Sequence, residues 1–164
     1  TFHCKDFYKG ISFYESYSSR YPDDGDPILK QFNLTPTWFP DLENKFKQTV
    51  SELSGVPFNK VSKIGFHIQK WEPGAFANLH SDNSDNEGNM GAFTRSRYAS
   101  FLYLNDDFEG GEIYYPKANL EIKPIARSLV VHPSGMIYRH GVKAVSNGER
   151  FSLAGFARLN HSNS

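Results

Sequence analysis

From residue 61 onward, short apolar segments alternate with turn residues, and this pattern limits the fold more than any other feature of the chain. Ile64, Phe66 and Ile68 occupy every second position of the first segment, as in a β-strand with one buried face. Clusters of glycine, proline, asparagine or aspartate recur about every 8–12 residues, a spacing typical of a sandwich or barrel. We therefore expect a jelly roll of two antiparallel sheets. Its predicted strands cover residues 61–71, 75–82, 98–104, 112–115, 120–122, 128–132, 138–142 and 150–158, with a tight hairpin-type turn at 146–149.

One clear helix precedes this β-rich part. Leu42, Phe46, Val50 and Leu53 lie three or four positions apart and form a single apolar stripe. A glycine and a proline shortly after the stripe end the helix. The pattern predicts a helix over residues 40–53 that supports the sheet, so the expected fold class is mainly β with N-terminal helices.

The length of 164 residues predicts a single domain, 1–164, with a helical supporting region at 1–60 and the β core at 61–159. The 18 basic and 18 acidic side chains give no net charge, which disfavours a nucleic-acid partner. A single cysteine excludes an internal disulfide and a thiolate metal cluster.

No apolar run approaches the ~20 residues of a membrane helix, so no membrane partner is expected. We expect a cytoplasmic protein, although a start at Thr1 leaves open a leader that was removed. The oligomeric state is not indicated.

Two histidines and an aspartate offer a set of metal ligands. His80 and Asp82 are two positions apart on a predicted strand, so their side chains point to the same face. With His140 they make two imidazoles and one carboxylate, a set that suits Fe(II) and leaves coordination positions open. Taken alone, the first two are more typical of an ordinary hydrogen-bonded pair at a strand end. Of the remaining histidines of the β core, His67 is expected to face outward or to be structural, and His132 to be structural.

Arg150 and Ser152 follow the last of these candidate ligands. A guanidinium and a hydroxyl on one face of a strand can bind a carboxylate through several hydrogen bonds. The sequence therefore predicts an anion site close to the metal site.

Residues 83–97 form a long polar segment directly after the first two candidate ligands, and we expect a flexible flap over the substrate. Arg95 and Arg97, at its end, are candidates for substrate contact, and are otherwise solvated charges. Trp71 and Phe156 are candidates for the wall of the substrate pocket, and are otherwise core residues.

Several further segments occur in an order known from one protein family. They are Trp-Glu-Pro-Gly from Trp71, Tyr-Leu-Asn-Asp from Tyr103, Phe-Glu-Gly-Gly-Glu from Phe108 and His-Gly-Val-x-x-Val from His140. Together with the His-x-Asp pair and Arg150, they resemble the core of the Fe(II)/2-oxoglutarate-dependent oxygenases, specifically the prolyl hydroxylase (prolyl 4-hydroxylase-like) branch. The resemblance spans residues 64–159 and does not extend to the first 60 residues.

The resemblance implies a double-stranded β-helix, which is a jelly roll, and a role for each matching residue. The residues that would hold Fe(II) are His80, Asp82 and His140. The residues that would bind the distal carboxylate of 2-oxoglutarate are Arg150, Ser152 and Tyr103. This chain departs from the family at Trp71, where a tyrosine is common, so only an indole N–H can donate there.

The resemblance also implies an activity. The chain would be a dioxygenase that uses O2 to hydroxylate an unactivated C–H bond and releases succinate and CO2, with ascorbate as a candidate reductant. Peptidyl proline is the expected substrate, which makes a proline-containing peptide or protein the expected partner. The same chemistry on a free amino acid or another small molecule remains an alternative, as does a non-catalytic metal- or ligand-binding jelly-roll module. A nucleic-acid demethylase is disfavoured, because Phe156 stands where those enzymes usually have a second arginine.

Overall fold

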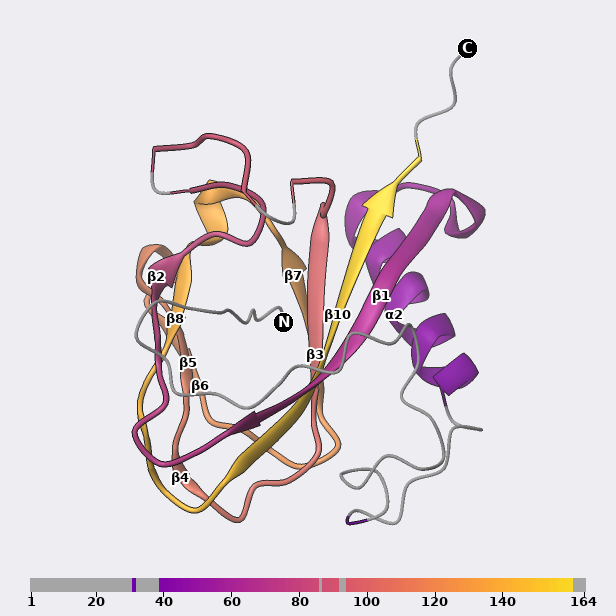
Figure 1. Ribbon diagram of the computed structural model, residues 1–164. Coiled ribbons are helices and arrows are strands. Elements are labelled where there is room, and N and C mark those ends of the chain that lie inside the picture. Colours follow the sequence, from indigo (N-terminus) through magenta and orange to yellow (C-terminus); the bar gives the residue numbers. More distant parts are fainter. Residues whose placement is uncertain (1–30, 32–38, 86, 92–93, 161–164) are drawn as a thin grey trace.

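The computed structural model describes residues 31, 39–85, 87–91 and 94–160 (Figure 1). The expectations for most of the first 38 residues lie outside this part of the chain, and a single domain over residues 1–164 stays a prediction. In chain order the elements are α2 (Phe39–Ser54), η2 (Phe58–Lys60), β1 (Val61–Trp71), β2 (Ala77–His80), β3 (Tyr98–Tyr103), β4 (Glu109–Gly110), β5 (Ile113–Tyr115), η3 (Pro116–Ala118), β6 (Leu120–Ile122), β7 (Leu129–Pro133), η4 (Met136–Tyr138), β8 (His140–Val142), β9 (Val145–Asn147) and β10 (Arg150–Leu159).

Two four-stranded antiparallel sheets face each other. One has the strand order β1-β10-β3-β7 and the other β2-β8-β5-β6, and a small two-stranded sheet joins β4 to β9. Figure 1 shows the first sheet between α2 and the second sheet. This is the jelly-roll arrangement expected from the sequence.

Helix α2 packs on the outer face of the first sheet. Its apolar stripe is buried, with Phe46 and Val50 at 0% exposure, and joins outward side chains of β1 and β10 in one hydrophobic cluster. The helix ends at Gly55, whose φ of 70° is the left-handed conformation that glycine adopts without strain. The predicted helix and its supporting role are confirmed.

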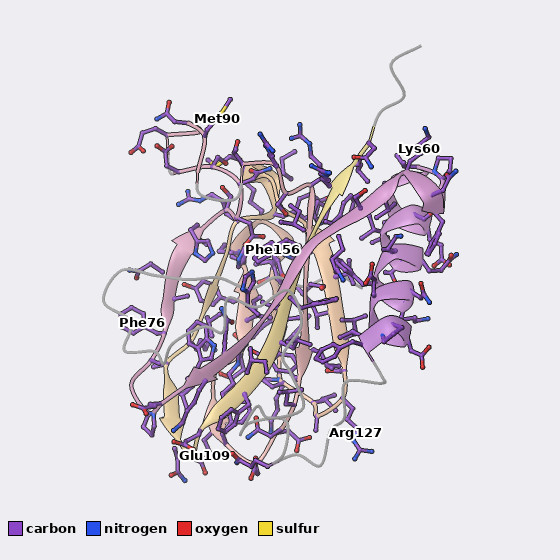
Figure 2. All side chains as sticks on the ribbon, turned by 45° about the vertical axis from the view of Figure 1, so that its right-hand side comes forward. Lys60, Phe76, Met90, Glu109, Arg127 and Phe156 are labelled. Carbon is purple, nitrogen blue, oxygen red and sulfur yellow. The ribbon has the colours of Figure 1, made fainter. Side chains whose placement is uncertain are left out.

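A second hydrophobic cluster fills the space between the two sheets. Its members come from both sheets, and Figure 2 shows one of them, Phe156, in the middle of the molecule. Strand β1 is therefore covered on both faces, by α2 outside and by this cluster inside. The face of β1 opposite its apolar residues was expected to be polar and solvated. It is partly buried, since Gln69 on that face is only 1% exposed.

Two local predictions differ from the structure. Strand β2 ends at His80 instead of continuing to Asp82. Beyond β2 the chain is held by a local bond, in which the hydroxyl of Ser81 donates to the Ser84 carbonyl at 2.9 Å. The predicted hairpin at 146–149 is also wrong, because β9 pairs with β4 whereas β10 crosses to the first sheet and pairs with β1 and β3.

The segment between β2 and β3 is organised by one aspartate where the structure describes it. Asp85 accepts hydrogen bonds from the backbone N–H groups of Glu87 and Asn89, at 2.9 and 2.8 Å. A bridge between Ser84 and Met90 closes the turn, and Figure 2 shows Met90 at its outer end. The flexibility of this segment stays a prediction.

Candidate active site

The structure brings the three candidate metal ligands together at one end of the second sheet. His80 is the last residue of β2 and lies opposite His140, the first residue of β8. Asp82 follows two residues after His80 and is buried at 6% exposure. One ligand atom from each of the three residues lies within 4.8 Å of the others, so a single metal ion fits among them.

Hydrogen bonds orient both imidazoles for this purpose. The Nδ1 atom of His140 lies 2.8 Å from the carbonyl oxygen of Tyr138, and Nδ1 of His80 contacts the carbonyl of Asn78 in the same way. A carbonyl oxygen can only accept, so each Nδ1 carries the hydrogen and each Nε2 presents a lone pair. These are the tautomers that bind a metal through Nε2, and the residues present therefore fit a divalent metal ion.

A third histidine supports the carboxylate of this set. His132, on β7, places its Nε2 atom 3.3 Å from Oδ2 of Asp82, and both side chains are fully buried. Its ring also lies 5.3 Å from that of His140. The expectation that His132 is purely structural is therefore incomplete, because it touches a candidate metal ligand directly.

Tyr115, on β5, borders the same group of residues. Its ring lies 5.6 Å from His140 and 6.1 Å from His132. Burial raises the pKa of the Tyr115 hydroxyl well above its ordinary value, and the negative charge of Asp82 raises it further. The hydroxyl therefore stays protonated and remains a hydrogen-bond donor in the interior.

The predicted anion site lies in the same interior. Arg150, the first residue of β10, has 0% exposure, and its Nη1 atom lies 3.5 Å from Oγ of Ser152. The centre of the guanidinium lies 4.9 Å from the Trp71 ring and 5.0 Å from the Tyr103 ring. The structure thus assembles the three residues expected to bind a carboxylate.

The charge of Arg150 is only partly compensated. Within the described residues, its Nε and Nη2 atoms have no hydrogen-bond partner. Burial lowers the pKa of Arg150, while the nearby Tyr103 hydroxyl opposes that effect. A buried guanidinium without a carboxylate partner is costly, so the site is suited to a bound anion.

Glycines allow the backbone to approach this arginine closely. Gly111 has a φ of 69°, and a Cβ atom there would lie 2.9 Å from Cδ of Arg150. At Gly110, whose φ is 76°, a Cβ atom would lie 2.1 Å from the Ala144 carbonyl oxygen. The glycine pair is therefore required by a bulge between β4 and β9 and by the packing of Arg150.

The remaining predicted residues divide into two groups. Trp71 and Phe156 are buried between the sheets at 1% exposure each, so both are core residues, and Trp71 also contacts the candidate site through Arg150. Arg95 and Arg97 are exposed on the segment that enters β3, and their contact with a substrate stays a prediction.

Three buried residues had no predicted role in the site: His132, Gln69 and Tyr115. Tyr115 alternates with the buried Ile113 and could have been placed inside, whereas Gln69 is on the face of β1 away from Phe66 and Ile68, so alternation alone predicts it outside.

Comparison with known proteins agrees with this geometry. Residues 66–158 match the model of the 2OG-Fe(II) oxygenase superfamily. Human prolyl 3-hydroxylase 3 is 35% identical over 88 residues, which are 46% of this chain and 12% of that protein. Prolyl 3-hydroxylase 1 of Gallus gallus is 40% identical over 68 residues, 38% of this chain and 9% of that protein. The chain thus spans only a small part of the curated relatives that it matches.

Solved structures show the same fold at low sequence identity. A Pseudomonas putida prolyl-4-hydroxylase has a TM-score of 0.57 and 23% identity, covering 85% of this chain and 69% of that one. A truncated viral collagen prolyl hydroxylase from Paramecium Bursaria Chlorella virus-1 has a TM-score of 0.59 and 13% identity, covering 92% of this chain and 75% of that one. These likenesses confirm the double-stranded β-helix. Since the family model matches more than half of the 164 residues, the chain belongs to the 2OG-Fe(II) oxygenase superfamily.

Proposed function

We propose that this chain is an Fe(II)- and 2-oxoglutarate-dependent dioxygenase that hydroxylates proline in a peptide or protein. The observation that carries the proposal is the joint presence, between the two sheets, of a buried His-Asp-His set and a buried arginine with unused donors. A metal site alone would not require the arginine. An anion site alone would not require two imidazoles whose Nε2 lone pairs converge with a carboxylate.

Each residue has a defined task in this proposal. His80, Asp82 and His140 hold Fe(II) and leave its remaining positions for the cofactor and O2. Arg150 binds the distal carboxylate of 2-oxoglutarate, assisted by the hydroxyls of Ser152 and Tyr103. Burial raises the pKa of Tyr103, so its hydroxyl stays protonated.

When bound, Fe(II) and 2-oxoglutarate supply the oxidising chemistry: O2 is consumed, the oxo acid becomes succinate and CO2, and one oxygen atom enters the substrate C–H bond. The protein orients the reactants and excludes water. The aromatic rings of Trp71 and Phe101 lie 4.9 and 5.9 Å from the guanidinium centre, so the anion site is walled by apolar surface.

Exposed apolar side chains beside the metal ligands support a peptide substrate. Ile137 and Tyr138, directly before β8, are 70% and 41% exposed, and Met90 on the β2–β3 segment is 85% exposed. Met136 ties this region to β2, because its sulfur accepts a hydrogen bond from Ser81 at 3.4 Å. Exposed apolar side chains close in the chain to the metal ligands support a surface that binds a partner. The similarity to prolyl 3-hydroxylases supports proline as the target.

Two experiments test the proposal in sequence. The first is an anaerobic titration with Fe(II) and 2-oxoglutarate, followed by the visible metal-to-ligand charge-transfer band. We expect the band in the wild type and in His67→Ala, a control on β1, and its loss in His140→Ala. No band in the wild type would refute the oxygenase assignment.

The second experiment concerns the substrate. Proline-containing peptides are expected to gain the mass of one oxygen atom, with stoichiometric release of succinate, whereas free proline and other free amino acids are not. Oxidation of a free amino acid without any peptide product would retain the chemistry and refute the peptide substrate.

A further inference from the structure

Gln69 is a buried amide in β1 that lacks hydrogen bonds. Its exposure is 1%, and neither Oε1 nor Nε2 has a partner among the residues that the structure describes. A buried amide without partners destabilises a protein, so native structures rarely retain one without another role. The hydrophobic interior would accept a leucine at this position more readily.

The register of the first sheet places this amide beside the anion site. Gln69 lies opposite Ser152, just as Trp71 lies opposite Arg150. Side chains two positions apart on a strand share one face, so Gln69 faces the interior together with Trp71. Directly opposed side chains on neighbouring antiparallel strands have Cβ atoms about 5 Å apart. The amide is therefore a neighbour of the Ser152 hydroxyl, which in turn contacts Arg150.

We propose that Gln69 is a further binding residue for 2-oxoglutarate, with its Nε2–H donating to a carboxylate oxygen of that cofactor. The inference rests on the proposed function, because it assigns the ligand that Arg150 would hold. A neutral amide suits this place: Arg150 already supplies a full positive charge, and an amide adds donors without another buried cation. The unsatisfied amide of the free protein then becomes satisfied when the cofactor binds.

The matched test replaces the amide by a side chain of similar size. Gln69→Leu is compared with the wild type and with Gln48→Leu, the same chemical change at an exposed position of α2. Two quantities are measured: the dissociation constant of 2-oxoglutarate by anaerobic calorimetry on the Mn(II)-loaded protein, and the thermal midpoint of the ligand-free protein. Mn(II) affinity is determined separately to verify that the metal site is intact.

The two measurements are expected to move in opposite directions. Gln69→Leu should bind 2-oxoglutarate about 10- to 100-fold more weakly, as expected for the loss of a hydrogen bond to a charged group. Its ligand-free thermal midpoint should rise, because a buried unsatisfied amide has been removed. Gln69→Glu should bind more weakly still, through repulsion between carboxylates. Gln48→Leu should leave the cofactor affinity unchanged.

Each contrary outcome has a distinct meaning. Equal cofactor affinity in the wild type and Gln69→Leu would overturn the role of Gln69 and leave the proposed function standing. A lower thermal midpoint in ligand-free Gln69→Leu would also overturn it, because the amide would then have partners inside the protein. A wild type that binds Mn(II) but no 2-oxoglutarate would refute the proposed function and the role of Gln69 together.

Discussion

Replacing His132 by phenylalanine should weaken metal binding without unfolding the protein. The Nε2 atom of His132 lies 3.3 Å from Oδ2 of Asp82 in a region closed to solvent. We expect this close contact to hold the carboxylate in place for the metal. Phenylalanine keeps the ring volume and the ring packing against Tyr115 and His140, whose centroids lie 6.1 and 5.3 Å away.

The magnitude follows from the loss of that one contact. Each 1.4 kcal/mol of binding free energy corresponds to about tenfold in affinity. Removal of residues that support metal ligands typically costs about 10- to 100-fold in metal affinity. We therefore expect His132→Phe to bind Fe(II) about 10- to 100-fold more weakly in an anaerobic competition titration against a chelator.

Two further variants make the measurement decisive. His132→Gln keeps an N–H donor and should recover part of the lost affinity. His67→Phe changes a histidine on β1 that packs near Phe156 and should leave metal affinity unchanged. If His132→Phe binds Fe(II) as tightly as the wild type, the contact with Asp82 does not support the metal site, and the proposed role of His132 is refuted.

Two other substitutions probe the anion site and the packing of the first sheet under α2. Arg150→Ala should weaken 2-oxoglutarate binding by about 2–4 kcal/mol, roughly 30- to 1000-fold, with Fe(II) affinity retained, and a calorimetric titration that found both constants unchanged would contradict the assigned role. Gly155→Ala should destabilise the protein by about 1–3 kcal/mol in urea unfolding, because the added Cβ atom would lie 2.3 Å from the ring of Phe66. Gly135→Ala is its control, since no atom lies within 4 Å of a Cβ placed there; equal stability of the two variants would refute the packing argument.

The fold was largely predictable because each buried face leaves a periodic pattern in the sequence. The stripe on α2 and the alternation in β1 both have one dominant apolar face, and both elements lie where expected. Strand partners were less predictable. The chain turns at Gly148 as a hairpin would, yet β10 leaves β9 and joins the other sheet, a choice made by contacts with β1 and β3 that are distant in sequence.

The candidate site was predictable where residue type alone indicates chemistry. Histidine, aspartate and a lone arginine at family-like spacing mark a metal and an anion, and the structure brings them into one interior. His132 and Gln69 carry no such local signal. Whether a polar residue on a strand is solvated or interior depends on what covers each face of the strand. Helix α2 covers the face of β1 that carries Phe66 and Ile68, whereas Gln69 is on the opposite face with Trp71, which packs into the cluster between the two sheets.

Because the site is divided between two sheets, the separation of the sheets limits the length of the cofactor that can bind. His80 and His140 belong to the sheet β2-β8-β5-β6, and Arg150 belongs to the sheet β1-β10-β3-β7. The span from metal to guanidinium is therefore set by the thickness of the packed layer between the sheets, which cannot change without disturbing the whole core. We therefore expect oxo dicarboxylates shorter or longer by one methylene to bind more weakly than 2-oxoglutarate. The relative affinity for different oxo acids thus depends on the packing of the whole core. Substitutions in the core between the sheets, remote from any ligand, are therefore expected to change it.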